Sequence, residues 1–251
     1  MTTKSKAVSG VAVAALLVIG GAVFWFLRDD APEDVDLDTA VKSVTTTTAK
    51  NGDTSSTAAA GSAATDGIDG TWKIDTTTGE FDFESATGTF AGFRIKEELA
   101  NIGSTTAVGR TNAVTGSMTI ADNSVTAADF TVDLTTITTN NSMRNRRVQD
   151  ALETGSHPDA TFTLTSPIVL PADAADGGEI NTTAKGDLAI HGVTKSVEFP
   201  LQAKLVNGTV VAVGSIDVTF SDFGVEVPSS QMVLSVEDHG TLELQFLLTK
   251  G

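Results

Sequence analysis

The stretch Gly186-Asp187-Leu188-Ala189-Ile190-His191-Gly192-Val193-Thr194-Lys195-Ser196-Val197-Glu198-Phe199-Pro200 decides the fold class. It consists of two strand-like runs on either side of a short turn that contains a glycine. After the turn, apolar residues occupy every second position, at Val197, Phe199, Leu201, Ala203 and Leu205. Such period-two alternation is typical of a β-strand with one apolar face and one face in water. The stretch therefore predicts an antiparallel hairpin.

The chain on both sides of this hairpin repeats the alternation. Further strand-like runs lie at 80–84, 93–96, 114–120, 130–134, 162–164, 209–220 and 242–248. Asn207-Gly208 predicts a type I′ turn, because both central residues of that turn need positive φ. Pro200 cannot donate to a strand ladder, so we expect a bulge or a gap beside it. In the run 209–220, Val211 and Val213 are exceptions to the alternation.

Eight or more antiparallel strands in residues 69–251 predict a sandwich or a barrel, and periodicity does not choose between them. An eight-stranded barrel has room for one small ligand, and inward phenylalanines would suit its lining. The alternative is that these rings fill a sandwich core. One segment, 140–153, predicts a short helix instead. Asn140, Asn141 or Ser142 can cap it, and Val148 shares a helical face with Ala151 and Leu152.

An uncharged segment, Ala7 to Leu27, stands near the N-terminus. Its 21 residues would span roughly 31 Å as a helix, close to the hydrocarbon core of a bilayer. Lys4 and Lys6 precede it, and Arg28 and several acidic residues follow, so the positive-inside rule places the N-terminus in the cytoplasm. The alternative is a cleaved signal peptide, but the bulky end of the segment lacks the small residues of a cleavage site. Residues 1–28 are thus predicted to be a membrane anchor.

Residues 29–68 are rich in Thr, Ala, Ser and Asp. This composition predicts a disordered linker, because such a segment buries too little apolar surface to offset its ordering entropy. We therefore expect a single-pass protein of the cell membrane. Its folded domain, residues 69–251, would lie on the extracytoplasmic side.

Composition excludes several classes of function. The chain has 32 acidic and 16 basic residues, a net charge of −16, which argues against a nucleic-acid partner. It has no Cys, so it has no disulfide or thiolate site. Its His157, His191 and His239 lie singly, without metal-ligand spacing, and we expect no metal site and no cofactor. There is no Gly-x-Ser-x-Gly motif and no phosphate loop, so we expect no catalytic residue. A hydrolase with an unrecognised site is the remaining enzymatic alternative.

Several motifs in residues 69–251 occur in an order typical of a known family. They are Gly70-Thr71-Trp72-Lys73-Ile74-Asp75, Gly92-Phe93-Arg94-Ile95, Met143-Arg144-Asn145-Arg146-Arg147-Val148, His157-Pro158-Asp159-Ala160-Thr161-Phe162, Leu188-Ala189-Ile190-His191-Gly192-Val193-Thr194 and Phe220-Ser221-Asp222-Phe223-Gly224. On these motifs the chain resembles the YceI-like family, in which an Asp is usual at the position of Asn145.

The resemblance implies a mainly β fold, an antiparallel eight-stranded lipocalin-like barrel with one short helix, that binds polyisoprenoid lipids. It implies a non-enzymatic protein that holds a polyprenyl or quinone lipid for carriage, storage or shielding at the cell envelope. The residues expected to line the barrel are Phe81, Phe83, Phe93, Phe130, Phe162, Phe199, Phe220 and Phe246. Barrels of this kind often pair, so a homodimer is compatible with the resemblance.

Candidates for contacting a lipid head group are Arg144, Arg147 and His191. Arginine binds phosphate with two hydrogen bonds, and three cations stand at 144–147. The alternative is an exposed helix face on which Arg146 and Arg147 pair with Asp150. His191 can equally be a hydrogen-bonded turn residue. For the whole protein, the alternative function is a ligand-free structural or interaction module of the cell envelope with a filled core.

Overall fold

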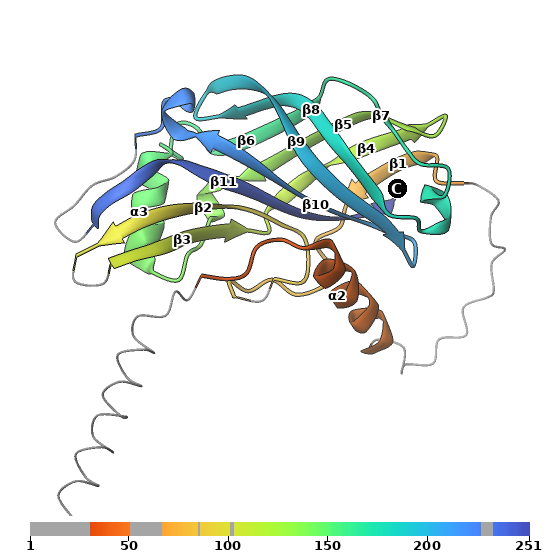
Figure 1. Ribbon diagram of the computed structural model, residues 1–251, viewed down its shortest axis with the longest axis horizontal. Helices are drawn as coiled ribbons and strands as arrows, with labels where there is room; N and C mark the ends of the chain where they lie inside the picture. Colours follow the sequence, from red (N-terminus) through yellow and green to blue (C-terminus); the bar gives the residue numbers. More distant parts are fainter. Residues whose placement is uncertain (1–30, 51–66, 85, 101–102, 227–232) are drawn as a thin grey trace, which may run out of the picture.

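The computed structural model describes residues 31–50, 67–84, 86–100, 103–226 and 233–251, which are mainly β (Figure 1). The α-helices in these ranges are α2 (Leu37–Lys50) and α3 (Ser142–Ala151). The strands are β1 (Gly70–Ile74), β2 (Phe90–Leu99), β3 (Gly103–Thr111), β4 (Val114–Ala121), β5 (Ser124–Asp133), β6 (Asp159–Leu164), β7 (Ile168–Val169), β8 (Ile180–Ile190), β9 (Val193–Val206), β10 (Thr209–Thr219) and β11 (Val233–Lys250). Short 3₁₀ turns are η1 (Leu134–Thr136), η2 (Ala174–Asp176) and η3 (Phe220–Phe223).

The strands close into an antiparallel eight-stranded barrel. The order around the ring is β1-β4-β5-β6-β8-β9-β10-β11, and β1 pairs with β11 to complete it. Trp72 of β1 lies opposite Met118 of β4 on one side and Lys250 of β11 on the other. The hairpin of β2 and β3 joins the long strand β11 beside β1. Of the two architectures compatible with the alternation, the structure is therefore the barrel, as the family resemblance implied.

Both predictions about the β9–β10 hairpin are confirmed. Asn207 and Gly208 have φ of 51° and 81°, the positive values that a type I′ turn requires. Pairing between β9 and β10 runs from this turn to Leu201 opposite Gly214, and ends there. The next residue of β9 is Pro200, which has no N–H to donate.

Alternation along the strands separates an apolar interior from the outer surface. In β11 the residues Leu242, Leu244, Phe246 and Leu248 belong to the core inside the barrel. The neighbouring Leu247 belongs to a separate apolar cluster, which includes residues of α2. The barrel therefore has a main core inside and a smaller one on its outer surface.

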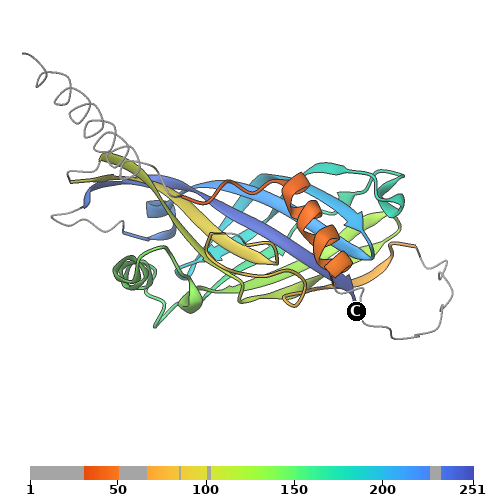
Figure 2. The same ribbon diagram turned by 90° about the horizontal axis from the view of Figure 1, so that it is seen from below.

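The prediction of a disordered linker over 29–68 is wrong for α2, which lies across the outside of the barrel (Figure 2). Leu37, Ala40 and Val44 are spaced by three and four residues, so they form one stripe on a helix. The stripe is buried against outward side chains of β10 and β11. These side chains are Val211, Val213 and Leu247. Burial of this stripe against the barrel stabilises the helix, although the composition of the segment predicted too little buried apolar surface for an ordered structure. The fold therefore contains two α-helices in the described ranges, not one.

Asp36 caps the start of α2. Its carboxylate accepts hydrogen bonds of 2.9 Å from both the N–H and the hydroxyl of Thr39. These hydrogen bonds lower the pKa of Asp36 below its usual value of 3.8.

A buried ion cluster holds the residues just before α2. Glu243 of β11 is buried on the outer surface of the barrel and pairs with Arg94 and Arg110. The two guanidinium groups also donate to the carbonyl oxygens of Pro32 and Glu33. Burial lowers the pKa of Arg110, and the charge of Glu243 opposes that shift. The chain is therefore fastened to the barrel from Pro32 onward.

The strand predicted at 80–84 is absent, and this prediction is wrong. Phe81 and Phe83 lie in the loop between β1 and β2 and do not line the interior. The loop is closed by Thr87, whose N–H donates to the carbonyl of Glu80 at 2.9 Å. Asp82 accepts from the N–H of Glu84 at 2.8 Å, a local turn contact that competes with strand pairing. Alternation over only two phenylalanines, without a strand to pair with, is therefore too short a pattern to predict a strand.

The predicted anchor, residues 7–27, lies outside the described residues. Within the described ranges, neither α2 nor α3 combines the length and the hydrophobicity that a membrane span needs.

Candidate functional site

The interior of the barrel contains a cavity of about 480 Å³, and its lining is almost entirely apolar. Six of the eight predicted lining residues surround it: Phe93, Phe130, Phe162, Phe199, Phe220 and Phe246. Phe130 packs against Phe246 with ring centroids 5.0 Å apart, and Phe162 lies edge-on to Phe199 at 5.5 Å. The rings therefore form the wall of a hollow interior and do not fill it. Cavities of this size are typical of small-molecule sites.

Helix α3 covers one end of the cavity. Val148, Ala151 and Leu152 contribute to the lining, as the predicted apolar face of the helix implied. Asn141, one of the three predicted caps, accepts hydrogen bonds from the N–H groups of Met143 and Arg144. The predicted helix at 140–153 is confirmed with bounds of 142–151.

Asn145 fixes the loop that leads into α3. Its side-chain oxygen accepts from the N–H and the hydroxyl of Thr139, at 2.8 and 2.7 Å. An aspartate could accept the same two hydrogen bonds. The departure from the family pattern at this position therefore preserves the acceptor.

Polar groups gather where α3 meets β2. Arg144 forms an ion pair with Glu97, and both side chains belong to the cavity lining. The Glu97 side chain is only 6% exposed and that of Arg144 21%. Arg147 also lines the cavity. The two predicted arginines thus stand at the cavity, and the pairing of Glu97 with Arg144 was not predicted.

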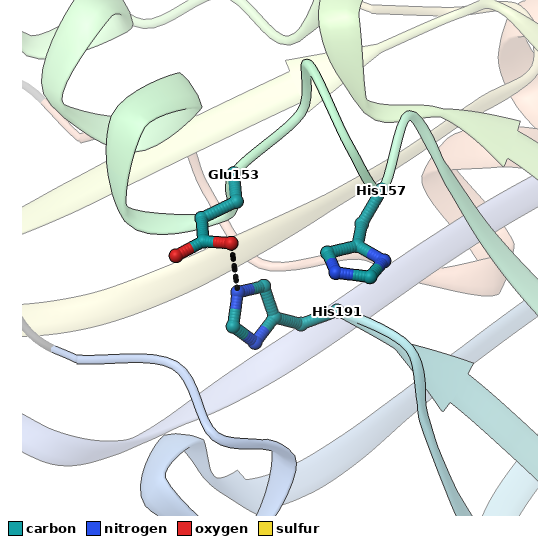
Figure 3. Close-up of side chains that lie close together, drawn as sticks. All are labelled: Glu153, His157 and His191. Atoms are coloured by element: carbon teal, nitrogen blue, oxygen red, sulfur yellow. Dashed lines mark ion pairs between the residues drawn. The ribbon is translucent and has the colours of Figure 1, made fainter.

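His191 does not line the cavity. It lies in the turn between β8 and β9, where its Nδ1 is 3.2 Å from the carbonyl oxygen of Phe223 in η3. Its neighbour Ile190 does line the cavity. His191 is therefore a hydrogen-bonded turn residue at the rim, as the alternative interpretation had it. The structure also brings it close to His157 and Glu153, which the linear spacing of the histidines did not predict (Figure 3).

The closed ring of eight strands, the apolar cavity and the helix at its end define a lipocalin-like barrel with a hollow interior. The chain belongs to the YceI-like family, because the model of the YceI-like domain matches residues 28–248.

Protein YceI of Escherichia coli O157:H7 is 33% identical over 121 residues, which are 47% of this chain and 56% of that protein. The matched region thus spans about half the length of these curated relatives. A UPF0312 protein of Vibrio parahaemolyticus is 24% identical over 157 residues, 58% of this chain and 78% of that protein.

Among solved structures, a polyisoprenoid binding domain from Saccharophagus degradans, implicated in plant cell wall breakdown, has a similar fold. Its TM-score is 0.54 and its sequence identity 16%, over 73% of this chain and 99% of that domain. At this identity the likeness concerns the fold.

Proposed function

We propose that this protein binds an isoprenoid lipid inside the barrel without chemically changing it. The cavity of about 480 Å³ with its phenylalanine wall carries this proposal, since an apolar chain is the ligand that such a lining favours. The Saccharophagus degradans domain of similar fold, which is a polyisoprenoid binding domain, supports it. A ligand-free module would have little use for a hollow core.

Burial of the apolar chain provides the driving force for binding. At about 25 cal/mol per Å², a chain that buries about 300 Å² of apolar surface gains about 7 kcal/mol before ordering costs. No charged partner is needed for this gain. The polar groups near α3 then determine which head group is accepted.

The pair of Glu97 and Arg144 favours an uncharged head group. Glu97 already balances the charge of Arg144, and a pyrophosphate there would meet the buried carboxylate. A quinone ring or an alcohol could instead accept from Arg144 or Arg147 without repulsion. We therefore propose a quinone or a polyprenol as the preferred ligand.

The cellular role would be carriage, storage or shielding of this lipid at the cell envelope. Residues 7–27 would tether the protein to the cytoplasmic membrane, with the barrel on the extracytoplasmic side. Because the natural chain has no Cys, Thr183→Cys on the outer surface of β8 gives a single label site. In intact cells, a membrane-impermeant maleimide should label this variant. Labelling only after lysis would contradict the proposed orientation.

Mass spectrometry of the full chain, purified from a host that makes isoprenoids, tests the ligand. A bound quinone or polyprenol that is lost on denaturation is expected. In Glu97→Gln, where Arg144 loses its counter-ion, the share of diphosphate-ended lipid should rise. Arg144→Ala should lower the occupancy, and an unchanged occupancy would remove Arg144 from the binding site. A wild-type chain that stays empty when offered several isoprenoids would contradict the proposal as a whole.

A further inference from the structure

Glu153 and His157, both in the connection between α3 and β6, meet His191 of the β8–β9 turn at the rim of the barrel (Figure 3). Glu153 follows α3, His157 stands two residues before β6, and His191 lies in the turn between β8 and β9. One ligand atom from each residue lies within 4.8 Å of the others. The His157 and His191 rings meet edge-on with centroids 5.0 Å apart.

The hydrogen bond of His191 fixes which ring nitrogen faces the cluster. A carbonyl oxygen only accepts, so the contact with Phe223 requires that Nδ1 carries a proton and donates it. In the neutral ring, Nε2 then has a lone pair. That nitrogen is buried and has no hydrogen-bond partner. It faces a carboxylate oxygen of Glu153 at 3.6 Å, which is also an electron-pair donor.

Two electron-pair donors that face each other at this distance are stabilised by a cation between them. Two ligands of a tetrahedral zinc ion, each at about 2.0–2.1 Å from the metal, lie about 3.3 Å apart. The observed 3.6 Å is close to this value, whereas it is long for a direct hydrogen bond. The bond from Nδ1 to a backbone carbonyl is the support that metal-binding histidines usually have.

We propose that Glu153, His157 and His191 form a site for a divalent transition metal ion, with Zn²⁺ as the best chemical match. Two imidazoles and one carboxylate suit zinc and leave its fourth position open. The exposed side chain of Glu153 gives the ion a path from solvent.

The backbone builds this arrangement. Glu153 has φ of 46°, and its carbonyl accepts from the N–H of His157 at 2.9 Å, which brings the two residues together. Gly192, at φ 75°, stands against the His157 ring. A Cβ there would come within 2.8 Å of the ring atom Cε1, so a glycine is required for the ring to approach His191.

The site is separate from the lipid cavity, because none of its three residues lines the cavity. Their neighbours Leu152 and Ile190 do. A bound ion would therefore link the C-terminal end of α3 to the barrel rim. Metal binding at this site is independent of which lipid occupies the cavity.

The test uses the full chain, purified without a polyhistidine tag and treated with chelator. Zn²⁺ binding is measured by calorimetry, and Co²⁺ is used as a spectroscopic probe of coordination. Wild type should bind one Zn²⁺, and Co²⁺ should show the visible bands of a tetrahedral site. At a hundredfold excess over Kd, Zn²⁺ should raise Tm by roughly 5–10 °C.

Glu153→Gln and His157→Gln should each weaken binding by on the order of tenfold or more. The matched control is His239→Gln. His239 also lies beside a carboxylate, with Nε2 3.2 Å from Glu237, but both side chains are largely exposed. The affinity of His239→Gln for Zn²⁺ should equal that of wild type. The metal-free Tm of each variant shows that it is folded.

Two results would overturn the proposal. One is equal affinity in wild type, Glu153→Gln and His157→Gln, which would place the bound metal on other acidic groups. The other is a folded wild type that shows no saturable Zn²⁺ or Co²⁺ binding.

Discussion

Replacing Arg144 by alanine would leave Glu97 buried at the end of the cavity without its cation. Removal of one partner from a buried ion pair costs about 3–5 kcal/mol. The Arg144 side chain is 21% exposed, so water reaches this partner, and we expect a loss at or below the lower end, about 2–3 kcal/mol. Glu97→Gln combined with Arg144→Ala contains no unpaired charge and should lie closer to wild type. The coupling energy between the two positions should be about 1–3 kcal/mol.

Urea unfolding of the four proteins, followed by circular dichroism, gives the double-mutant cycle. The midpoint should fall most for Arg144→Ala, and the second substitution should restore part of the loss. A coupling energy below about 0.5 kcal/mol would contradict a buried ion pair, because it would mean that Glu97 and Arg144 are solvated like a surface pair.

Three further predictions concern the fold. Leu37→Ala should detach α2 and expose the segment to limited proteolysis, because Leu37 is buried in the apolar cluster between α2 and the outside of the barrel. The control Thr45→Ala changes an exposed side chain of α2 and should not increase cleavage. Equal cleavage of the two variants would contradict the docking of α2. Gly116→Ala should cost far more stability than Gly208→Ala, because a Cβ at Gly116 would come within 2.1 Å of the Asp129 carbonyl oxygen. At Gly208 nothing lies within 4 Å of the added Cβ, and only the positive φ costs about 1 kcal/mol. Similar decreases in Tm for the two variants would contradict this ranking. Burial raises the pKa of Asp75, but hydrogen bonds from Thr77 and Thr78 outweigh it and hold the pKa below 3.8. The stability that Asp75 contributes is therefore present above pH 3.8 and is lost as pH falls through its folded pKa. In Asp75→Asn the free energy of unfolding should depend less on pH in the acid range, and an unchanged slope would contradict this.

The strands were predictable because their signal is local. Alternation and the turn residues identified most strands and two hairpins, β8–β9 and β9–β10. Closure was not predictable from alternation, because it depends on β1 pairing with both β4 and β11, far away in sequence. The resemblance to a family supplied the barrel.

The sequence of β10 contains an indication that another element covers its outer face. Val211 and Val213 break the alternation of β10, and on the outer surface they receive Leu37, Ala40 and Val44. Outward apolar residues on a strand indicate that something covers them. The apolar stripe on α2 stands among threonines, so it indicates a docked helix only when it is considered together with the outward valines of β10.

The site was half predictable. Inward phenylalanines followed from alternation and the helix from its capping residues. The buried partner of Arg144 could not be inferred, since Glu97 is 47 residues away along the chain. The approach of His157 to His191 likewise depends on how α3 and the β8–β9 turn meet at the rim, which no spacing records.

The claim that a lipid occupies the interior is tested most directly by filling the cavity. Ala184 lines it from β8, and the adjacent Thr183 points outward on the same strand. Native mass spectrometry should show the bound isoprenoid in wild type and in Thr183→Phe, and a loss of most of it in a folded Ala184→Phe. Equal occupancy in the two variants would contradict binding inside the barrel.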